Sequence, residues 1–231
     1  MIITFQGNPW TAYTVQVSTN LADWQDLTEL PGTANGFHSM TNFPAGKTFY
    51  RTVANSAPGQ IVTTIDASSP PSRQVLISKA SPTANVALAV FDIKSVSENA
   101  TLRKLSIVIN TAGGTPSQND IDQLFTNVKI RVGSLMYSAD TIPVLTSSGE
   151  VVFNNLNIPL PSDVYVPVTV FGDVPQDTGG ILNGISATLT LVSSGTSGGT
   201  SNNPYAEDAN FNSIGVSSAV LSCNSVTFSD P

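Results

Sequence analysis

The chain of 231 residues contains one histidine and one cysteine, so few side chains are available for nucleophilic catalysis. Any Ser-His-Asp or Cys-His arrangement would have to use His38. This histidine follows Gly36 and Phe37 in a short segment that is flanked by turn residues. We expect an exposed or hydrogen-bonded loop histidine at this position and not a general base.

Cys223 lies between strand-like residues in the segment VLSCN. A reactive thiolate needs a basic neighbour or a helix terminus, and the sequence shows neither near this residue. We therefore expect Cys223 to be a buried and inert core residue. A single cysteine also excludes a disulfide within the chain.

Three pairs of acidic residues are the remaining candidates for glycosidase carboxylates or calcium ligands. The pairs are Asp120 with Asp122, Asp173 with Asp177, and Glu207 with Asp208. We expect surface solvation or turn capping for each pair, because no stretch has the complete calcium-loop pattern with its glycine. The segments 119–122 and 202–212 are the best candidates for metal ligation.

Aromatic side chains in the N-terminal part offer a surface on which a sugar ring could stack. The candidates are Trp10, Tyr13, Trp24 and Tyr50. Trp24 and Tyr50 look like core residues, whereas Trp10 follows a turn and is the best candidate for exposure. We expect core packing or subunit contact here before carbohydrate binding. The sequence thus assigns no catalytic, cofactor-binding or metal-binding residue and implies no cofactor.

The composition and charge of the chain argue against some classes of binding partner. Only 11% of the residues are charged, and the formal net charge is −7 with a pI near 4.4. An acidic chain with few Lys and Arg residues argues against nucleic acid or an anionic membrane as a partner. No apolar run approaches the roughly 18 residues of a membrane-spanning helix, so no membrane insertion is expected. The first residues, MIITFQGNPW, have neither the basic nor the apolar region of a signal peptide.

Alternating apolar residues separated by turn signals predict an all-β chain. The clearest stretch is 151–174, where two apolar runs flank a Pro-Ser-Asp turn. In its second run Val164, Val166, Val168 and Val170 fall on one face of a strand. The segment 120–125 is predicted to form one helical turn, capped by Asn119 or Asp120.

The N-terminal segment contains the pattern YTVQVSTNLADWQDL, followed by FYRTV. The residues that carry this pattern are Tyr13, Ser18, Leu21, Trp24, Phe49, Tyr50 and Arg51. The pattern resembles the short fibronectin-III-like module of large bacterial surface proteins. The resemblance implies a β-sandwich that acts as a spacer or binding module and has no catalytic residues.

The rest of the chain is predicted to form a second module. Residues 56–74 are rich in Pro and Ser and read as a linker between module 1–55 and module 75–231. Residues 61–65 could add a last strand to the first module, and 72–231 is expected to fold alone. The segments VALAVFDIKSV, FTNVKIRVGS and VPVTVFGDVP resemble Ig-like repeats of bacterial surface and S-layer-type proteins. A jelly-roll is the alternative architecture.

The function expected from these observations is structural and non-enzymatic. We expect two β-sandwich modules that dock on other protein subunits of a larger assembly, through strand edges and apolar loop tips. A bacteriophage virion component on the particle surface, such as a capsid decoration protein, head fibre or tail appendage, fits this expectation. The alternatives are a cell-surface layer or filament subunit, and an extracellular adhesion or carbohydrate-binding module that recognises a surface glycan.

Overall fold

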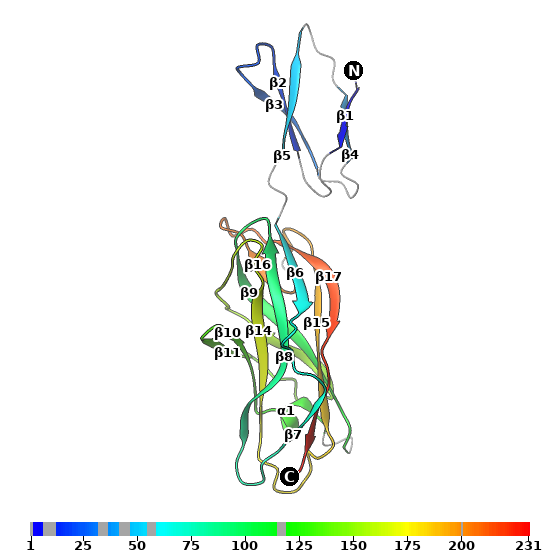
Figure 1. The fold of residues 1–231 in the computed structure, drawn as a ribbon, viewed down its shortest axis with the longest axis vertical. Coiled ribbons are helices and arrows are strands. Elements are labelled where there is room, and N and C mark those ends of the chain that lie inside the picture. Colours follow the sequence, from blue (N-terminus) through cyan, green and yellow to red (C-terminus); the bar gives the residue numbers. More distant parts are fainter. Residues whose placement is uncertain are drawn as a thin grey trace. The chain divides into compact units, whose positions relative to one another are not determined.

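The computed structural model describes residues 2–6, 13–31, 37–41, 47–54, 59–114, 119–199 and 201–231. These residues form strands and one short helix, so the chain is all-β, as its alternating apolar pattern predicted. The chain divides into two compact units, Met1–Gly59 and Gln60–Pro231. Each unit has its own strands (Figure 1).

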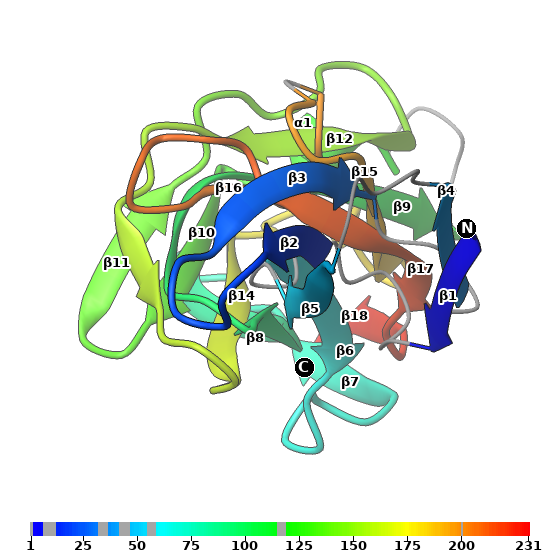
Figure 2. The same ribbon diagram turned by 90° about the horizontal axis from the view of Figure 1, so that it is seen from above.

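The smaller unit contains two antiparallel sheets (Figure 2). One sheet pairs β1 with β4, and the other has the order β3-β2-β5. Their bounds are β1 (Ile2–Gln6), β2 (Tyr13–Ser18), β3 (Gln25–Leu30), β4 (Phe37–Thr41) and β5 (Phe49–Ala54). Burial alternates at the start of β2. Tyr13 and Val15 are buried, and Thr14 between them is half-buried.

The turn between β2 and β3 is built by two polar side chains. The Ser18 hydroxyl accepts the backbone N–H groups of Asn20 and Leu21 at 3.2 and 2.9 Å. The Asn20 side-chain oxygen accepts those of Ala22 and Asp23, each at 2.9 Å. Such side chains replace the backbone partners that a tight turn cannot supply. The Ser-Thr-Asn-Leu-Ala-Asp segment therefore encodes this turn directly.

The larger unit consists of thirteen of the described strands and the helical turn. Their bounds are β6 (Gln60–Ile65), β7 (Arg73–Leu76), β8 (Thr83–Val96), β9 (Ala100–Ala112), α1 (Ile121–Leu124), β10 (Asn127–Val132), β11 (Leu135–Ser138), β12 (Ser148–Phe153), β13 (Ile158–Leu160), β14 (Val166–Val174), β15 (Ser186–Gly195), β16 (Tyr205–Glu207), β17 (Gly215–Ser222) and β18 (Val226–Ser229). The hydrogen-bonded order is β11-β10-β14-β8-β6-β17-β15-β18-β7, and β9 joins this path by pairing with β15. Most neighbours are antiparallel; β6 with β17 and β7 with β18 are parallel.

Strand β9 changes partners along its length. Its C-terminal half pairs with β12 on one side and β15 on the other. Its N-terminal half pairs with β13 and β16. Four strands are therefore held by one strand, and two of them, β15 and β16, come from a later part of the sequence than β12 and β13.

A single apolar core contains residues from two groups of hydrogen-bonded strands, β10-β14-β8 and β12-β9-β15. Phe125 and Phe228 meet edge to face in it, with ring centroids 5.9 Å apart. A side chain at Gly172 would collide with the Phe125 ring, so this position of β14 requires glycine. The expected alternation holds in β14, where Val168 and Val170 are buried, until a bulge follows Val170.

A short segment after β11 bridges the ends of the two groups. The backbone N–H of Ala139 donates to Val128 of β10 at 2.8 Å, and that of Asp140 donates to Val152 of β12 at 2.9 Å. Thr141 then forms a bridge with Val152. The segment thus occupies strand edges that would otherwise offer free backbone groups to other chains.

The structure differs from two expectations along the chain. Residues 60–65, which lay in the expected linker 56–74, form β6 and pair with β8 and β17 of the larger unit, not with the smaller unit. The apolar side chain of Ile61 decides this, because it is fully buried in the larger core. Val164, expected on one strand face with Val166, Val168 and Val170, lies before β14 and is 51% exposed, because its backbone N–H closes a turn on the carbonyl of Pro161 at 3.2 Å.

The expected helical turn is confirmed as α1. Asp120 occupies its N-cap position, although its side chain makes no capping hydrogen bond. Within the described residues, no helix has the length and apolar character needed to cross a bilayer.

Candidate functional site: a polar groove beside strand β9

His38 lies on β4 and is buried, with 3% of its surface exposed. Its ring stacks on Phe5 at 5.0 Å between centroids and meets Tyr13 edge on at 5.1 Å. Its Nε2 atom has no hydrogen-bond partner in the described part of the chain. His38 therefore differs from the expected exposed or hydrogen-bonded loop histidine in its burial and in its place on a strand, because aromatic packing between two sheets encloses the ring.

Cys223 is a buried core residue, as expected. Its sulfur accepts the backbone N–H of Leu189 at 3.2 Å. Burial raises the pKa of the thiol above its ordinary value, which disfavours the thiolate. Cys223 therefore lies against Leu189 of β15, directly after the end of β17, as a small apolar side chain.

Asp122 and Asp173, from the first two acidic pairs, each have hydrogen-bond partners of their own. Asp122 accepts the N–H of Leu145 at 3.0 Å. Asp173 forms an ion pair with Lys129 at 2.6 Å and accepts the N–H of Asn85 at 2.8 Å. Burial by itself raises the pKa of Asp173, but the hydrogen bonds from Lys129 and Asn85 outweigh burial and lower the pKa overall.

Asp177 is only 2% exposed and organises the loop that follows it. Its carboxylate accepts the backbone N–H groups of Gly179, Ile181 and Leu182 at 3.2, 3.0 and 2.6 Å. Three amide donors satisfy a buried carboxylate in the absence of a cation. The turn-capping role expected of the acidic pairs is thus found at Asp177.

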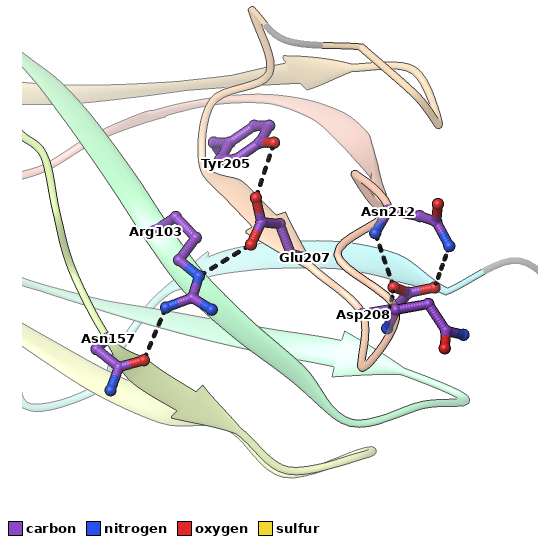
Figure 3. Close-up of polar contacts among 7 residues, drawn as sticks. Arg103, Asn157, Tyr205, Glu207, Asp208 and Asn212 are labelled. Carbon is purple, nitrogen blue, oxygen red and sulfur yellow. Dashed lines mark hydrogen bonds and ion pairs between the residues drawn. The ribbon is translucent and has the colours of Figure 1, made fainter.

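Asp208 plays the same role in an exposed loop. It accepts the N–H groups of Asn210 and Asn212, each at 2.8 Å, and the Asn212 side-chain amide at 3.0 Å. The Asn212 hydrogen bond is the main reason that the pKa of Asp208 lies below its usual value. N–H groups thus point at the carboxylate where a metal ion would need to sit (Figure 3). Among the described residues, His, Cys, Asp and Glu do not gather into a metal-binding group.

The aromatic candidates do not form one platform in the described residues. Tyr13 is buried. Trp24 and Tyr50 were expected to be core residues, but both are only half-buried. Trp24 lies beneath the guanidinium of Arg51, 4.3 Å from its ring centroid. Trp10 lies outside the described residues.

Residues 195–199 have the spacing G-x-S-x-G, although the sequence was expected to contain no such motif. Gly195 ends β15 and the other four residues lie in the loop that follows, without the strand-to-helix turn that makes such a serine a nucleophile. The hydroxyl of Ser197 donates to the carbonyl of Ser213 at 3.4 Å. The motif is therefore part of the loop packing.

Glu207 belongs to a different arrangement, a polar groove of about 770 Å³ that is open to solvent. The groove lies where β9, β16 and the 154–157 loop meet. It is lined by Arg103, Lys104, Asn154, Asn155, Leu156, Asn157, Tyr205 and Glu207. Leu156 is the one apolar member of this lining.

Arg103 holds the groove together. Its Nε donates to Glu207 at 3.0 Å, and its Nη1 donates to the Asn157 side chain at 2.8 Å. Its backbone carbonyl accepts the N–H of Leu156 at 2.9 Å. The Tyr205 hydroxyl donates to the second oxygen of Glu207 at 3.1 Å (Figure 3). One strand residue thus positions side chains from β16 and from the 154–157 loop.

The hydroxyl of Tyr205 keeps its proton in the groove. Burial raises the pKa of Tyr205, and its hydrogen bond to the Glu207 carboxylate raises the pKa further. The hydroxyl is therefore a hydrogen-bond donor at neutral pH. Glu207 is paired with the Arg103 guanidinium and accepts a hydrogen bond from the Tyr205 hydroxyl.

No family model, curated protein or solved structure matches this chain.

Sequence reasoning placed Glu207 in an acidic pair and did not find Arg103, Lys104 or the asparagines. The one feature of the sequence that could have indicated the groove is the asparagine-rich run 154–157, which lies between two apolar strands. Arg103 and Glu207 are 104 residues apart in the chain, so their contact carries no local pattern.

Proposed function

We propose that the protein is a non-enzymatic structural subunit that docks its β-modules on other proteins of a larger assembly. The form we propose is a bacteriophage virion component exposed on the particle, such as a capsid decoration protein, head fibre or tail appendage. The alternative is a cell-surface layer or filament subunit, which would dock on other subunits in the same way.

We also propose that both units are β-sandwiches of the fibronectin-III or immunoglobulin kind. In the smaller unit, ring contacts among Phe5, Tyr13 and His38 join residues of the two separate sheets. In the larger unit, two groups of strands share one core. Groups of strands around a common apolar interior support this class.

One observation carries the docking proposal: an apolar groove of about 460 Å³ on the larger unit. It lies between the β10–β11 turn and the segments around β13 and the start of β14. Leu135 and Tyr165 line it and remain 55% and 44% exposed. Three prolines, Pro159, Pro161 and Pro167, complete its wall. Exposed apolar surface of this kind is characteristic of protein contacts.

The smaller unit is proposed to contribute to docking as well. Ile2, Phe37 and Val53 project from its strands with large exposed fractions. A unit of this size buries little apolar surface by itself, and contact with a partner would add to its stability.

Sedimentation tests the docking proposal. The purified chain is mixed with particles and, separately, with cell envelopes from the source culture, and each mixture is centrifuged. We expect co-sedimentation with particles for the wild type and loss of it for Leu135→Asp with Tyr165→Asp. Leu76→Asp is the control, because Leu76 is exposed and lies outside the groove. A wild-type chain that stays in the supernatant with both fractions would contradict the proposal, and co-sedimentation with envelopes alone would favour the cell-surface alternative.

A deletion tests the smaller unit. A chain that lacks residues 1–59 should fold but fail to incorporate into particles. Normal occupancy by the truncated chain would reject a docking role for this unit and leave the groove as the contact.

A further inference from the structure

We propose that the polar groove beside β9 binds a carboxylated saccharide, that is, a short chain of sugar rings bearing carboxylate groups. This binding is separate from the docking proposed above, which uses a different groove. The proposal rests on four features of the polar groove: its free donors, its local charge, its size and its rigidity.

The groove presents hydrogen-bond donors that the protein does not use. Within the described chain, the Lys104 ammonium, the Arg103 Nη2 and the side-chain amides of Asn154 and Asn155 make no hydrogen bond or ion pair. Among the described residues, Asn154 makes its hydrogen bond through the backbone N–H, which donates to the Asp140 carboxylate at 2.8 Å. A ligand that enters the groove therefore meets several open donors.

The local charge is opposite in sign to that of the chain. Two cations, Arg103 and Lys104, line the groove with one anion, Glu207, and Glu207 is already paired with Arg103. The whole chain carries a net charge of −7. Lys104 is thus a cation that lines the groove without an ion-pair partner in the described chain, and a carboxylate is the matching ligand group.

Size and chemistry favour a saccharide over a simple anion. A volume of about 770 Å³ is far larger than one carboxylate needs and falls in the range of sites for larger ligands. Asparagine amides both donate and accept, as sugar hydroxyls do. Tyr205 adds an aromatic ring to the wall, against which the apolar face of a sugar ring can pack.

The groove is also held in shape before any ligand binds. Arg103 is fixed by Glu207 and Asn157, and Glu207 is fixed again by Tyr205 (Figure 3). Asn155 has a φ of +54°, a conformation that asparagine adopts more readily than most residues, so the 154–157 loop has a defined turn. Side chains that are already ordered lose little entropy on binding.

Calorimetric titration of the full chain tests the proposal, with trigalacturonate, maltotriose and sodium acetate as probes. We expect trigalacturonate to bind, with an affinity at least roughly tenfold above that of neutral maltotriose or of acetate, because the charge-assisted hydrogen bond and the sugar contacts act together. Binding should weaken as sodium chloride is raised. Absence of trigalacturonate binding, equal binding of maltotriose, or equal binding of acetate would each overturn the proposal.

The variant Lys104→Gln tests whether the ligand binds in this groove. We expect this variant to weaken trigalacturonate binding roughly tenfold and Lys104→Arg to retain it. Lys47→Gln is the matched control, since it removes the same charge from an exposed residue of the smaller unit. Equal weakening by Lys104→Gln and Lys47→Gln would overturn the assignment to this groove.

Nuclear magnetic resonance gives a readout that does not depend on affinity. Addition of trigalacturonate should shift the amide signals of Lys104, Asn155 and Tyr205 and leave those of the smaller unit unchanged. Shifts confined to the apolar groove at Leu135 and Tyr165 would overturn the proposal. Because the saccharide test is done on the isolated chain, its result is independent of particle co-sedimentation.

Discussion

At the scale of single residues, the acidic side chains of this protein act as anchors for the backbone. Asp177 and Asp208 each gather N–H groups of the loop that follows them. They differ in burial, because Asp177 is enclosed and Asp208 is close to solvent. Water can replace a lost partner at Asp208 but not at Asp177, so the same substitution should have different costs at the two sites.

Asp177→Ala should lower the free energy of unfolding of the larger unit by about 3 kcal/mol, because it leaves three backbone N–H groups without an acceptor. Asp177→Asn should cost less, since one oxygen remains. Urea denaturation followed by circular dichroism measures both. Asp208→Ala serves as the control and should have a much smaller effect; equal losses at the two positions would show that burial does not matter here.

The ion pair between Asp173 and Lys129 should make stability depend on pH. Both side chains are largely enclosed, with 18% and 15% exposed. The pKa of Asp173 is lowered in the folded protein: burial opposes this, but the hydrogen bonds from Lys129 and Asn85 prevail. Stabilisation by this carboxylate is therefore complete above the unfolded pKa, about 4, and is lost as the pH falls through the folded pKa.

Asp173→Asn should cost about 1–2 kcal/mol at pH 7, and the difference from the wild type should shrink as the pH is lowered from 5 toward 2. Urea midpoints measured across this range test the prediction. Glu150→Gln is the control, because Glu150 is exposed and has no ion pair among the described residues. A difference that stays constant with pH would mean that the cost of Asp173→Asn is not electrostatic.

At the scale of elements, the Asn203 side chain supplies hydrogen bonds to β9 at the point where the neighbouring strand changes from β15 to β16. The Asn203 oxygen accepts the N–H of Ser106 at 2.9 Å. Its amide donates to the carbonyls of Ser106 and Val192 at 2.9 and 2.8 Å. The side chain thus replaces a missing piece of strand between β9 and β15, and it leaves these backbone groups satisfied.

Asn203→Ala should lower the free energy of unfolding by about 2 kcal/mol, because it removes hydrogen bonds from backbone groups of two strands. Asn203→Asp should cost more, since a carboxylate would face two carbonyl oxygens. Amide hydrogen exchange at Ser106 should become faster in both variants. Asn210→Ala, in the exposed loop, should change neither quantity, and unchanged exchange at Ser106 in Asn203→Ala would contradict this role for Asn203.

At the scale of the whole molecule, β6 decides where the larger unit begins. It pairs with β8 along its full length and with β17 at its start. Ile61 is fully buried, and the Thr63 hydroxyl lies 2.6 Å from that of Ser193. The expectation that residues 72–231 would fold alone left this strand out.

A chain of residues 60–231 should fold with a single cooperative transition, whereas 72–231 should be destabilised by more than about 3 kcal/mol or be insoluble. Removal of β6 takes Ile61 from the core and exposes an edge of β8. Denaturation of both chains, with the full chain as reference, is the measurement. Equal stability of the two truncated chains would mean that β6 is dispensable.

The sequence by itself determined the class of structure and many of its local details. Alternation predicted the strands and the buried face of Val168 and Val170, and the Ser-Thr-Asn-Leu segment encodes its own turn. These features depend on residues that are close in the chain, so a pattern of two or three positions is enough to specify them.

Only the tertiary structure decided which strands are neighbours and where the polar groove forms. The assignment of β6 depends on the burial of Ile61, and the enclosure of His38 depends on rings from β1 and β2. The contact of Arg103 with Glu207 joins positions 104 residues apart. The physical reason is that the local sequence sets the period of a strand, whereas strand pairing is set by the long-range burial of whole faces.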